Sequence, residues 1–188
     1  MTFDNVWFLS DYGLEDEFVG VVKAVIRAIA PHATVGDVTH SIPAHDIRAG
    51  ALALARSMQY LTLVPSVVLA VIDPGVCSSR RAVAVEAGGE NGDHPGAILV
   101  GPDNGLLAPA VAMAGGARRA VSLTNEDYHL PAPGPTFAGR DIFAPAAAHL
   151  CAGVDLAELG ELIDPALLLP AVLPVTDLKD DELVCEVL

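Results

Sequence analysis

The chain has 188 residues, of which 52% are hydrophobic and only 5% are aromatic. This length allows one sizeable core, and the excess of small aliphatic residues favours a sheet covered by alanine-rich helices over an all-β sandwich. The formal net charge of -14 would repel a polyanion, so we expect neither nucleic acid nor an anionic membrane as a partner. A cationic small ligand remains compatible with this charge.

The three cysteines give no sign of a disulfide framework or of a thiolate zinc site. Cys77, Cys151 and Cys185 are widely spaced and form no CxxC pair. The first residues contain no basic segment followed by an apolar one, and no apolar run of about 18 residues is free of Gly, Pro and charge. We therefore expect reduced thiols and a cytoplasmic protein.

The first half of the chain predicts alternating strands and helices. Short apolar runs that end in polar turn residues indicate buried strands, whereas apolar residues spaced three and four positions apart indicate helices. Pro31 ends the first helix and Asp46 caps the second. In chain order we expect a strand at Asn5–Ser10, a helix at Phe18–Ile29, a strand at Thr34–Val38, a helix from Ile47 through Met58 and a central strand at Ser66–Ile72.

The second half predicts three further strands and two helices, separated by Gly-rich and Pro-rich connections. The polar stretch Gly88–Gly96 indicates an exposed turn, and Leu130–Pro135 indicates a loop. In chain order we expect strands at Arg81–Ala87 and Ala97–Val100, a helix at Leu106–Met113, a strand at Ala120–Leu123 and a helix at Gly139–Ala152. The predicted fold class is α/β, with a central, largely parallel or mixed sheet flanked by helices.

Two segments with different organisation are expected. Residues 1–165 form the α/β domain, and residues 166–188 form a Pro-rich linker followed by a strand that begins at Leu183 and runs to Leu188. An apolar strand without a partner leaves an exposed sheet edge. We therefore expect either that this strand pairs back on the domain or that it is the first strand of a truncated C-terminal domain.

Polar side chains follow several of the predicted strands at the point where each strand ends. Asp11, His40, Asp73 and Asn104 occupy such positions. Because the ligand crevice of an open α/β sheet lies at the carboxyl ends of its strands, we expect these side chains to converge. The chain contains no GxGxxG, GxxxxGK[ST] or GxSxG motif, so nucleotide-phosphate binding and acyl-enzyme chemistry both lose support.

Five segments between Val6 and Gly160 carry a family resemblance. SDYGLEDEFVGVVKAVI, DVTHSIPAHDIRAGA, VIDPGVCSSRRAVAVE, GPDNGLL and TFAGRDIFAPAAAHL occur in this order and resemble the N-terminal domain of the S-adenosylmethionine (SAM) hydroxide adenosyltransferases, relatives of fluorinase and chlorinase. The resemblance implies hydrolysis of SAM to adenosine and L-methionine without metal or other cofactor. It also implies a C-terminal β-barrel domain and a homotrimer with its sites at subunit interfaces.

The resemblance assigns substrate contacts to six residues of this chain. Asp11 is expected to bind the ribose hydroxyls, since a carboxylate accepts two O–H donors, and Asp16 to meet the methionine ammonium. His45 and Phe137 are expected to line opposite sides of the nucleoside with their aromatic rings. The remaining expected contacts are Asn104 and Gly139.

Asp73 and Arg80 match two of the three residues with which the family positions and activates water. Asp73 would accept the proton of the water, and Arg80 would stabilise the developing hydroxide. The third residue is absent, because the family motif TFHGRD has become TFAGRD and Ala138 replaces the histidine. His129 lies nine residues earlier, but nothing in the sequence requires it to reach the site.

Three alternatives stay open. Ala138 and the missing domain are compatible with a module that binds SAM or adenosine without catalysis. A SAM-dependent halogenase is less favoured, since a carboxylate at Asp73 within a few Å of a halide would repel it by about 4 kcal/mol at an effective dielectric constant near 20. A metal-dependent hydrolase would draw oxygen-rich ligands from the predicted strand ends, namely Asp11, Asp37, His40, Asp73 and Asp103.

Overall fold

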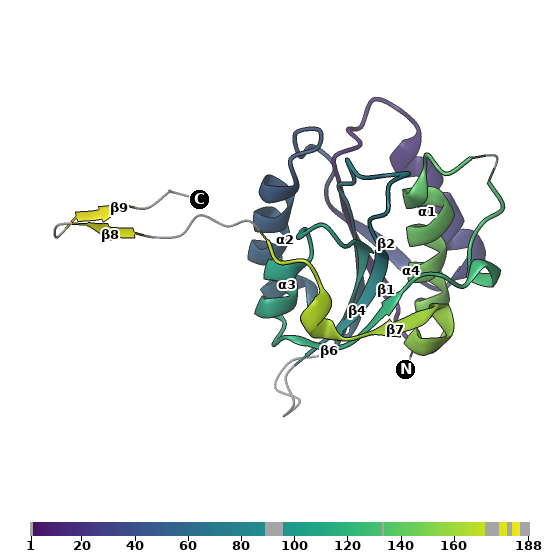
Figure 1. The fold of residues 1–188 in the computed structure, drawn as a ribbon. Coiled ribbons are helices and arrows are strands. Elements are labelled where there is room, and N and C mark those ends of the chain that lie inside the picture. The colour runs from purple at the N-terminus through teal and green to yellow at the C-terminus, as the bar shows by residue number, and fades with distance from the viewer. Residues whose placement is uncertain (1, 89–95, 133, 172–176, 180–181, 185–188) are drawn as a thin grey trace.

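Seven strands form one mixed sheet at the centre of the computed structural model, which describes residues 2–88, 96–132, 134–171, 177–179 and 182–184 (Figure 1). The strand order is β2-β1-β3-β5-β4-β6-β7. The first four strands in this order are parallel, and β4, β6 and β7 pair antiparallel. The strands are β1 (Asn5–Ser10), β2 (Thr34–Thr39), β3 (Ser66–Val71), β4 (Ala82–Ala87), β5 (Ala97–Pro102), β6 (Ala117–Ser122) and β7 (Glu161–Ile163).

Helices cover both faces of this sheet, with α1 and α4 on one face and α2 and α3 on the other (Figure 1). Alternate side chains of each buried strand enter the two cores, so Phe8 packs beneath α1 whereas Leu9 packs beneath α2. The helices are α1 (Phe18–Ile29), α2 (Ile47–Leu61), α3 (Ala108–Met113) and α4 (Ala144–Cys151), and the short turns are η1 (Glu126–Tyr128), η2 (Gly139–Phe143), η3 (Leu156–Leu159) and η4 (Pro165–Leu167).

The α/β fold class is confirmed, and the predicted cap of the second helix is present. The carboxylate of Asp46 accepts a hydrogen bond from the backbone N–H of Ala49 at 2.8 Å. The predicted helix at Gly139–Ala152 is one continuous helical segment that begins as the π-helical turn η2 and continues as α4. A π-turn widens the helix by one residue per turn and often occurs at functional sites.

Strand β7 was not predicted, and its physical properties explain why. It is three residues long, it lies at the edge of the sheet, and Leu162 is 62% exposed. Such a strand has too few residues to show a two-residue periodicity. The expected turn at Gly88–Gly96 lies mostly outside the described residues.

The tail contains a two-stranded antiparallel sheet of its own. Strand β8 (Asp177–Lys179) pairs with β9 (Glu182–Val184). The predicted strand from Leu183 to Leu188 therefore overlaps a strand at its first two residues, and the rest lies outside the described residues. In the described part, this strand pairs with β8 and not with the central sheet.

The connections around β1 create a crevice. Helix α1 carries the chain from β1 to β2 over one face of the sheet, and α2 carries it from β2 to β3 over the opposite face. Since β1 lies between β2 and β3, the order of strands reverses there, and ligands of open α/β sheets bind beside the carboxyl ends of such strands. Within the described residues, none of the helices has the length and apolar character needed to span a bilayer.

Candidate active site

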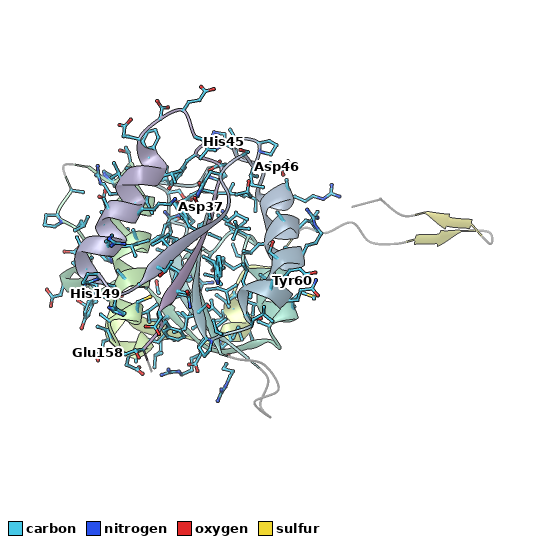
Figure 2. All side chains as sticks on the ribbon, turned by 180° about the vertical axis from the view of Figure 1, so that it is seen from behind. Asp37, His45, Asp46, Tyr60, His149 and Glu158 are labelled. Atoms are coloured by element: carbon cyan, nitrogen blue, oxygen red, sulfur yellow. The ribbon has the colours of Figure 1, made fainter. Side chains whose placement is uncertain are left out.

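A cavity of about 610 Å³ lies at the carboxyl ends of β1 and β3. Its walls come from four separate segments: Asp11 follows β1, His45 follows β2, Asp73 follows β3, and Phe137 lies in the loop before η2. Clefts that bind small molecules typically measure about 300–1,000 Å³. The cavity therefore has the size and the position expected of a ligand site, and Figure 2 shows where His45, one of its wall residues, lies on the molecule.

Asp11 is held in place by the loop that follows β2. One carboxylate oxygen of Asp11 accepts the backbone N–H of His45 at 2.8 Å. His45 adopts a left-handed backbone conformation with φ at 67°, which is unfavourable for a residue with a side chain and persists only where the surroundings impose it. The backbone of His45 thus orients Asp11 at the cavity wall, and the His45 side chain is exposed.

Asp73 and Arg80 form a bidentate ion pair at the turn after β3. The Nε atom of Arg80 donates to both carboxylate oxygens at 2.9 and 3.0 Å, and an Nη atom of Arg80 donates to one of them. The side chains are only 7% and 14% exposed. The guanidinium also lies 5.2 Å from the ring centroid of Phe143, so its plane is fixed by an acid and by an aromatic face.

Aromatic rings form another wall of the cavity. The ring centroid of Phe137 lies 5.7 Å from that of Tyr12 and 5.1 Å from that of Phe18, and the guanidinium of Arg140 lies 5.1 Å from Phe137. Burial, reinforced by Asp11 and Asp73 and opposed by Arg80, raises the pKa of Tyr12 above its ordinary value. Tyr12 therefore keeps its phenolic proton and can donate a hydrogen bond into the cavity.

Gly139 lines the cavity beside the hydroxyl of Tyr12. A Cβ atom at this position would lie 2.0 Å from the Tyr12 hydroxyl oxygen and 3.2 Å from a ring carbon of Phe137. Any side chain at position 139 would therefore displace the aromatic wall.

Two expected substrate contacts lie away from these walls. Asp16 is exposed in the turn before α1. The side-chain amide of Asn104 donates to the carbonyl of Ile72 at 2.9 Å, and its oxygen accepts the N–H of Leu106 at 3.2 Å. Asn104 thus connects the end of β3 to the segment before α3, and neither it nor Asp16 belongs to the residues that line the cavity.

Among the wall residues that were not predicted from the sequence are Tyr12, Phe18 and Arg140. Tyr12 directly follows Asp11, and Arg140 lies within the TFAGRD segment, so a signal for both was present. Phe18 is the first residue of the predicted helix Phe18–Ile29, yet it is 39% exposed and contacts Phe137. A residue on the first turn of a helix can reach past the core into a neighbouring crevice, which periodicity alone does not reveal.

His129 and Ala138 line a neighbouring cavity of about 570 Å³. Ala138 also lines the larger cavity, whereas His129 does not. The Nε2 atom of His129 is buried and has no hydrogen-bond partner among the described residues. Burial lowers the pKa of His129, although Glu126 and the backbone of Leu123 oppose this effect. The structure therefore places His129 behind Ala138 and not at the Asp73 wall.

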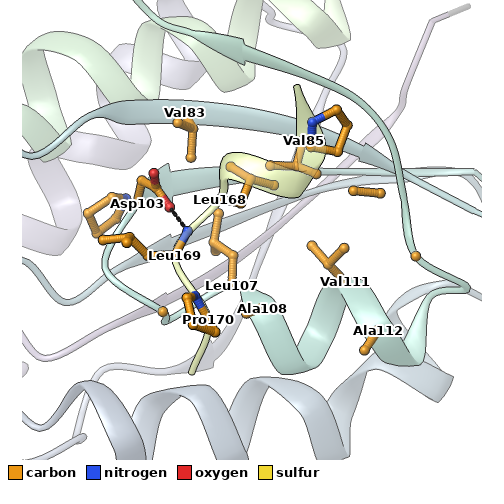
Figure 3. Close-up of a pocket in the computed structure, with 15 residues that line it drawn as sticks. Val83, Val85, Asp103, Leu107, Ala108, Val111, Ala112, Leu168, Leu169 and Pro170 are labelled. Atoms are coloured by element: carbon orange, nitrogen blue, oxygen red, sulfur yellow. Dashed lines mark hydrogen bonds between the residues drawn. The ribbon is translucent and has the colours of Figure 1, made fainter. Parts of the chain in front are cut away.

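A third cavity, of about 240 Å³, is apolar and lies on the α3 face of the sheet (Figure 3). Val83, Leu107 and Val111 form its floor, and residues 165–170, called the strap below, close one side. Its one charged wall residue, Asp103, accepts the N–H of Leu169 at 2.8 Å and a hydrogen bond from Nε of Arg81 at 2.9 Å. Both oxygens of Asp103 are thus engaged by groups of the protein, so we assign the chemistry to the cavity at Asp73.

The described residues contain no cluster of three or more His, Cys, Asp or Glu side chains that could hold a metal ion. Three of the carboxylates considered for such a site are instead each paired with a cation: Asp37 with Lys23, Asp73 with Arg80 and Asp103 with Arg81. The geometry gives the metal-dependent alternative no support.

Comparison with known proteins agrees with the fold. Residues 6–160 match the family model of the SAM hydroxide adenosyltransferase N-terminal domain. The chain is 45% identical over 181 residues to an (R)-S-adenosyl-L-methionine hydrolase of Salinispora tropica, covering 96% of this chain and 66% of that protein. It is 46% identical over 162 residues to a protein of the same name from Thermus thermophilus, covering 82% of this chain and 60% of that protein.

A solved structure has the same architecture. An uncharacterized conserved protein from Thermotoga maritima superposes with a TM-score of 0.73 at 37% sequence identity, covering 84% of this chain and 57% of that one. The chain thus spans two thirds or less of the length of these relatives. The family match covers most of the chain, which therefore belongs to the SAM hydroxide adenosyltransferase family and carries its N-terminal domain.

Proposed function

We propose that this chain supplies the nucleoside-binding and water-activating part of an enzyme that hydrolyses SAM to adenosine and L-methionine. The observation that carries the proposal is the Asp73–Arg80 pair, whose carboxylate lines the same cavity as Asp11 and Phe137. The hydrolase names of the two curated relatives support the reaction. Because the chain covers only part of those relatives, the activity of the whole protein is part of the proposal.

The cavity walls suit the two ends of the nucleoside. The carboxylate of Asp11 accepts the ribose hydroxyls, and the His45 N–H that already binds it prevents it from turning away. The rings of Tyr12 and Phe137 offer aromatic faces to the adenine or to the positive sulfonium. The contact of Asp16 with the methionine ammonium stays a prediction.

The reaction needs little further machinery. A water oxygen forms a bond to C5′ of SAM in line with the C5′–S bond, and the bonding pair leaves on the sulfur of methionine, a neutral thioether that needs no general acid. The proton of the water passes to Asp73, and Arg80 holds this carboxylate in place. Charge is lost as hydroxide meets sulfonium, so a cavity that excludes bulk water favours the step.

The direct test is incubation with SAM in a chloride buffer, followed by chromatography. Adenosine and methionine in equal amounts are expected, in the absence of added metal and in the presence of a chelator. Formation of 5′-chloro-5′-deoxyadenosine would identify a halogenase instead. Turnover that stops on adding the chelator would identify a metal-dependent enzyme.

One observation favours a second candidate, a SAM-binding or adenosine-binding module without catalysis. Ala138 brings only a methyl group to the wall of the cavity, and His129 does not line that cavity. Binding of SAM by calorimetry without adenosine over days would select this candidate. Adenosine formation by an Ala138→His variant but not by the natural chain would show that the missing imidazole is the reason.

The proposal includes a cytoplasmic, cofactor-independent homotrimer whose sites lie at subunit interfaces. The family resemblance supports it. Sedimentation equilibrium at several protein concentrations measures the oligomeric state. A mass of one chain at all concentrations would contradict the trimer for this chain.

A further inference from the structure

A series of hydrogen bonds, buried at Ser10 and His40, connects the cavity wall with the end of β2. The hydroxyl of Ser10 lies 2.7 Å from Nδ1 of His40, and Nε2 of His40 lies 3.0 Å from a carboxylate oxygen of Asp37. The backbone N–H of Tyr12 donates to the Ser10 hydroxyl at 3.3 Å. Ser10 is fully buried and His40 is 3% exposed. The mechanism proposed above uses none of these three side chains.

The chemistry of the acceptors places the protons. An ionised carboxylate only accepts hydrogen bonds, so the proton between His40 and Asp37 belongs to Nε2 of His40. In the neutral ring, which carries one proton, Nδ1 then accepts the Ser10 O–H, and the Ser10 oxygen accepts the Tyr12 N–H. Every donor points from the cavity towards Asp37, and hydrogen bonds aligned in this way polarise and strengthen one another.

Lys23 completes the outer end of the series. Its ammonium lies 2.6 Å from the second oxygen of Asp37. Partial burial raises the pKa of Asp37, but the hydrogen bonds from Lys23 and His40 outweigh it and lower this pKa below its ordinary value. The carboxylate therefore stays ionised at neutral pH and remains an acceptor for His40. Figure 2 shows Asp37 on the strand below the loop that carries His45.

The group is not a nucleophilic triad, although it has the composition of one. Ser10 has no exposed surface, so no substrate carbonyl can reach its oxygen. The ring is also reversed, because serine hydrolases bond the serine to Nε2 and the aspartate to Nδ1, whereas here Ser10 meets Nδ1.

The series acts on the residues between its anchors. Asp11 lies between Ser10, whose side chain binds Tyr12 N–H, and Gly13, whose N–H donates to the carbonyl of His40 at 2.8 Å. The ring of His40 also packs edge-on against the ring of Phe8, with 4.6 Å between the two ring centroids. The turn that carries Asp11 and Tyr12 is thus connected to the ring of His40 through Ser10 and to the backbone carbonyl of His40 through Gly13.

We propose that Ser10, His40 and Asp37 are positioning residues, which hold Asp11 and Tyr12 in the geometry that binds the ribose of the substrate. The choice of substrate in this inference rests on the proposed function. The choice of residues rests on the hydrogen bonds described above. Their removal should weaken substrate binding more than it slows the chemical step, because Asp73 is held separately by Arg80.

The experiment compares Ser10→Ala with Ser66→Ala, followed by His40→Leu and His40→Asn. Ser66 is a matched control, since it is also fully buried and its hydroxyl donates to the carbonyl of Val64 at 2.9 Å, but it lies at the opposite end of the neighbouring strand β3. The asparagine variant retains an acceptor near the position of Nδ1 and should restore part of what leucine loses.

Ser10→Ala and His40→Leu are expected to raise KM for SAM by about tenfold with a smaller change in kcat, whereas Ser66→Ala leaves KM near its original value. Nitrogen chemical shifts should identify the Nε2–H tautomer of His40, and the Tyr12 amide should exchange faster in Ser10→Ala. An Nδ1–H tautomer, or equal KM values in Ser10→Ala and Ser66→Ala, would overturn the inference.

The same variants separate this inference from the proposed function. If the natural chain forms no adenosine from SAM, the hydrolase proposal fails, and the inference is judged by adenosine binding in calorimetry. A weaker affinity in Ser10→Ala but not in Ser66→Ala would then support the positioning role. Equal affinities, or no binding of adenosine to the natural chain, would overturn it.

Discussion

Arg80 and Arg81 are neighbours in the chain, and each donates several hydrogen bonds to a buried aspartate. Their partners are similarly inaccessible, with exposed fractions of 7% for Asp73 and 4% for Asp103. The two pairs differ in what surrounds them. Asp73 faces a cavity with polar and aromatic walls, whereas the second oxygen of Asp103 accepts the N–H of Leu169 in the strap. Asp103 also lines a cavity, but an apolar one, so a buried ion pair indicates chemistry only where the adjoining cavity has polar walls and the carboxylate is not taken up by the backbone.

The largest effect is expected when the Asp73–Arg80 pair is disrupted. Asp73→Asn keeps the size of the side chain but removes the proton acceptor, so adenosine formation should fall by about a thousandfold. Initial rates measured by chromatography check this expectation, and circular dichroism shows whether the variant folds. A variant that kept at least a tenth of the natural rate would show that Asp73 is not the proton acceptor.

The second pair should respond in stability and not in rate. Asp103→Ala leaves Arg81 and the Leu169 N–H without their acceptor and should lower the free energy of unfolding by about 3 kcal/mol. Adenosine formation at a temperature where the variant is folded should remain close to that of the natural chain. Urea unfolding measures the first quantity, and a variant with unchanged stability but no activity would reverse the roles assigned to the two pairs.

Glycine substitutions test how much the aromatic wall contributes to stability and to SAM binding, beside the Asp73–Arg80 pair. Gly139→Ala forces the Tyr12 hydroxyl away from a new methyl group and should lower stability by about 1–3 kcal/mol and raise KM for SAM. Gly20→Ala is the matched control, since nothing lies within 4 Å of a Cβ atom there. Within helix α1, this control should raise stability by about 0.5–1 kcal/mol. A Gly139→Ala variant more stable than the Gly20→Ala variant would contradict the packing described for Gly139.

The smallest effect concerns a third, exposed pair, Asp37–Lys23. The pKa of Asp37 is lowered in the folded chain, so the stabilisation is fully present above its ordinary value of 3.8 and is lost as pH falls through the folded pKa. The difference in unfolding free energy between the natural chain and Asp37→Asn should be constant near neutrality and shrink below pH 3.8. Urea titrations at several pH values measure it. A difference that grew on acidification would contradict the lowered pKa.

Much of the fold could be predicted from the sequence because the buried parallel strands are long apolar runs and the helices have strong periodicity. Asp11 and Asp73 could be predicted as candidate site residues for the same reason, since each directly follows such an apolar run. Asn104 also follows a strand, yet its amide binds the backbone of Ile72 and Leu106. Position at a strand end identifies candidates, but it does not decide whether a polar side chain binds a ligand or a neighbouring backbone.

The features that the sequence did not predict depend on contacts between distant residues. The strap is held by Asp103, which lies 66 positions before Leu169, and no local pattern indicates this contact. Phe18 and Phe137 come together from the two ends of the domain to form the aromatic wall. Such pairs are determined by the packing of α1 against the segment before α4, which becomes known only with the complete fold.

The pairing of β1 with β3 has a consequence for the two carboxylates at the cavity. These strands are hydrogen-bonded in parallel with Ser10 opposite Val71 as the last rung of the ladder, so Asp11 lies one residue and Asp73 two residues beyond that rung. The ladder fixes the two strand ends from which these residues emerge, and the contacts of the following loops orient their side chains. Central strands of this kind open only when the whole domain unfolds. The spacing of the two strand ends that carry these acids should therefore persist on heating until the melting temperature and vanish together with the fold.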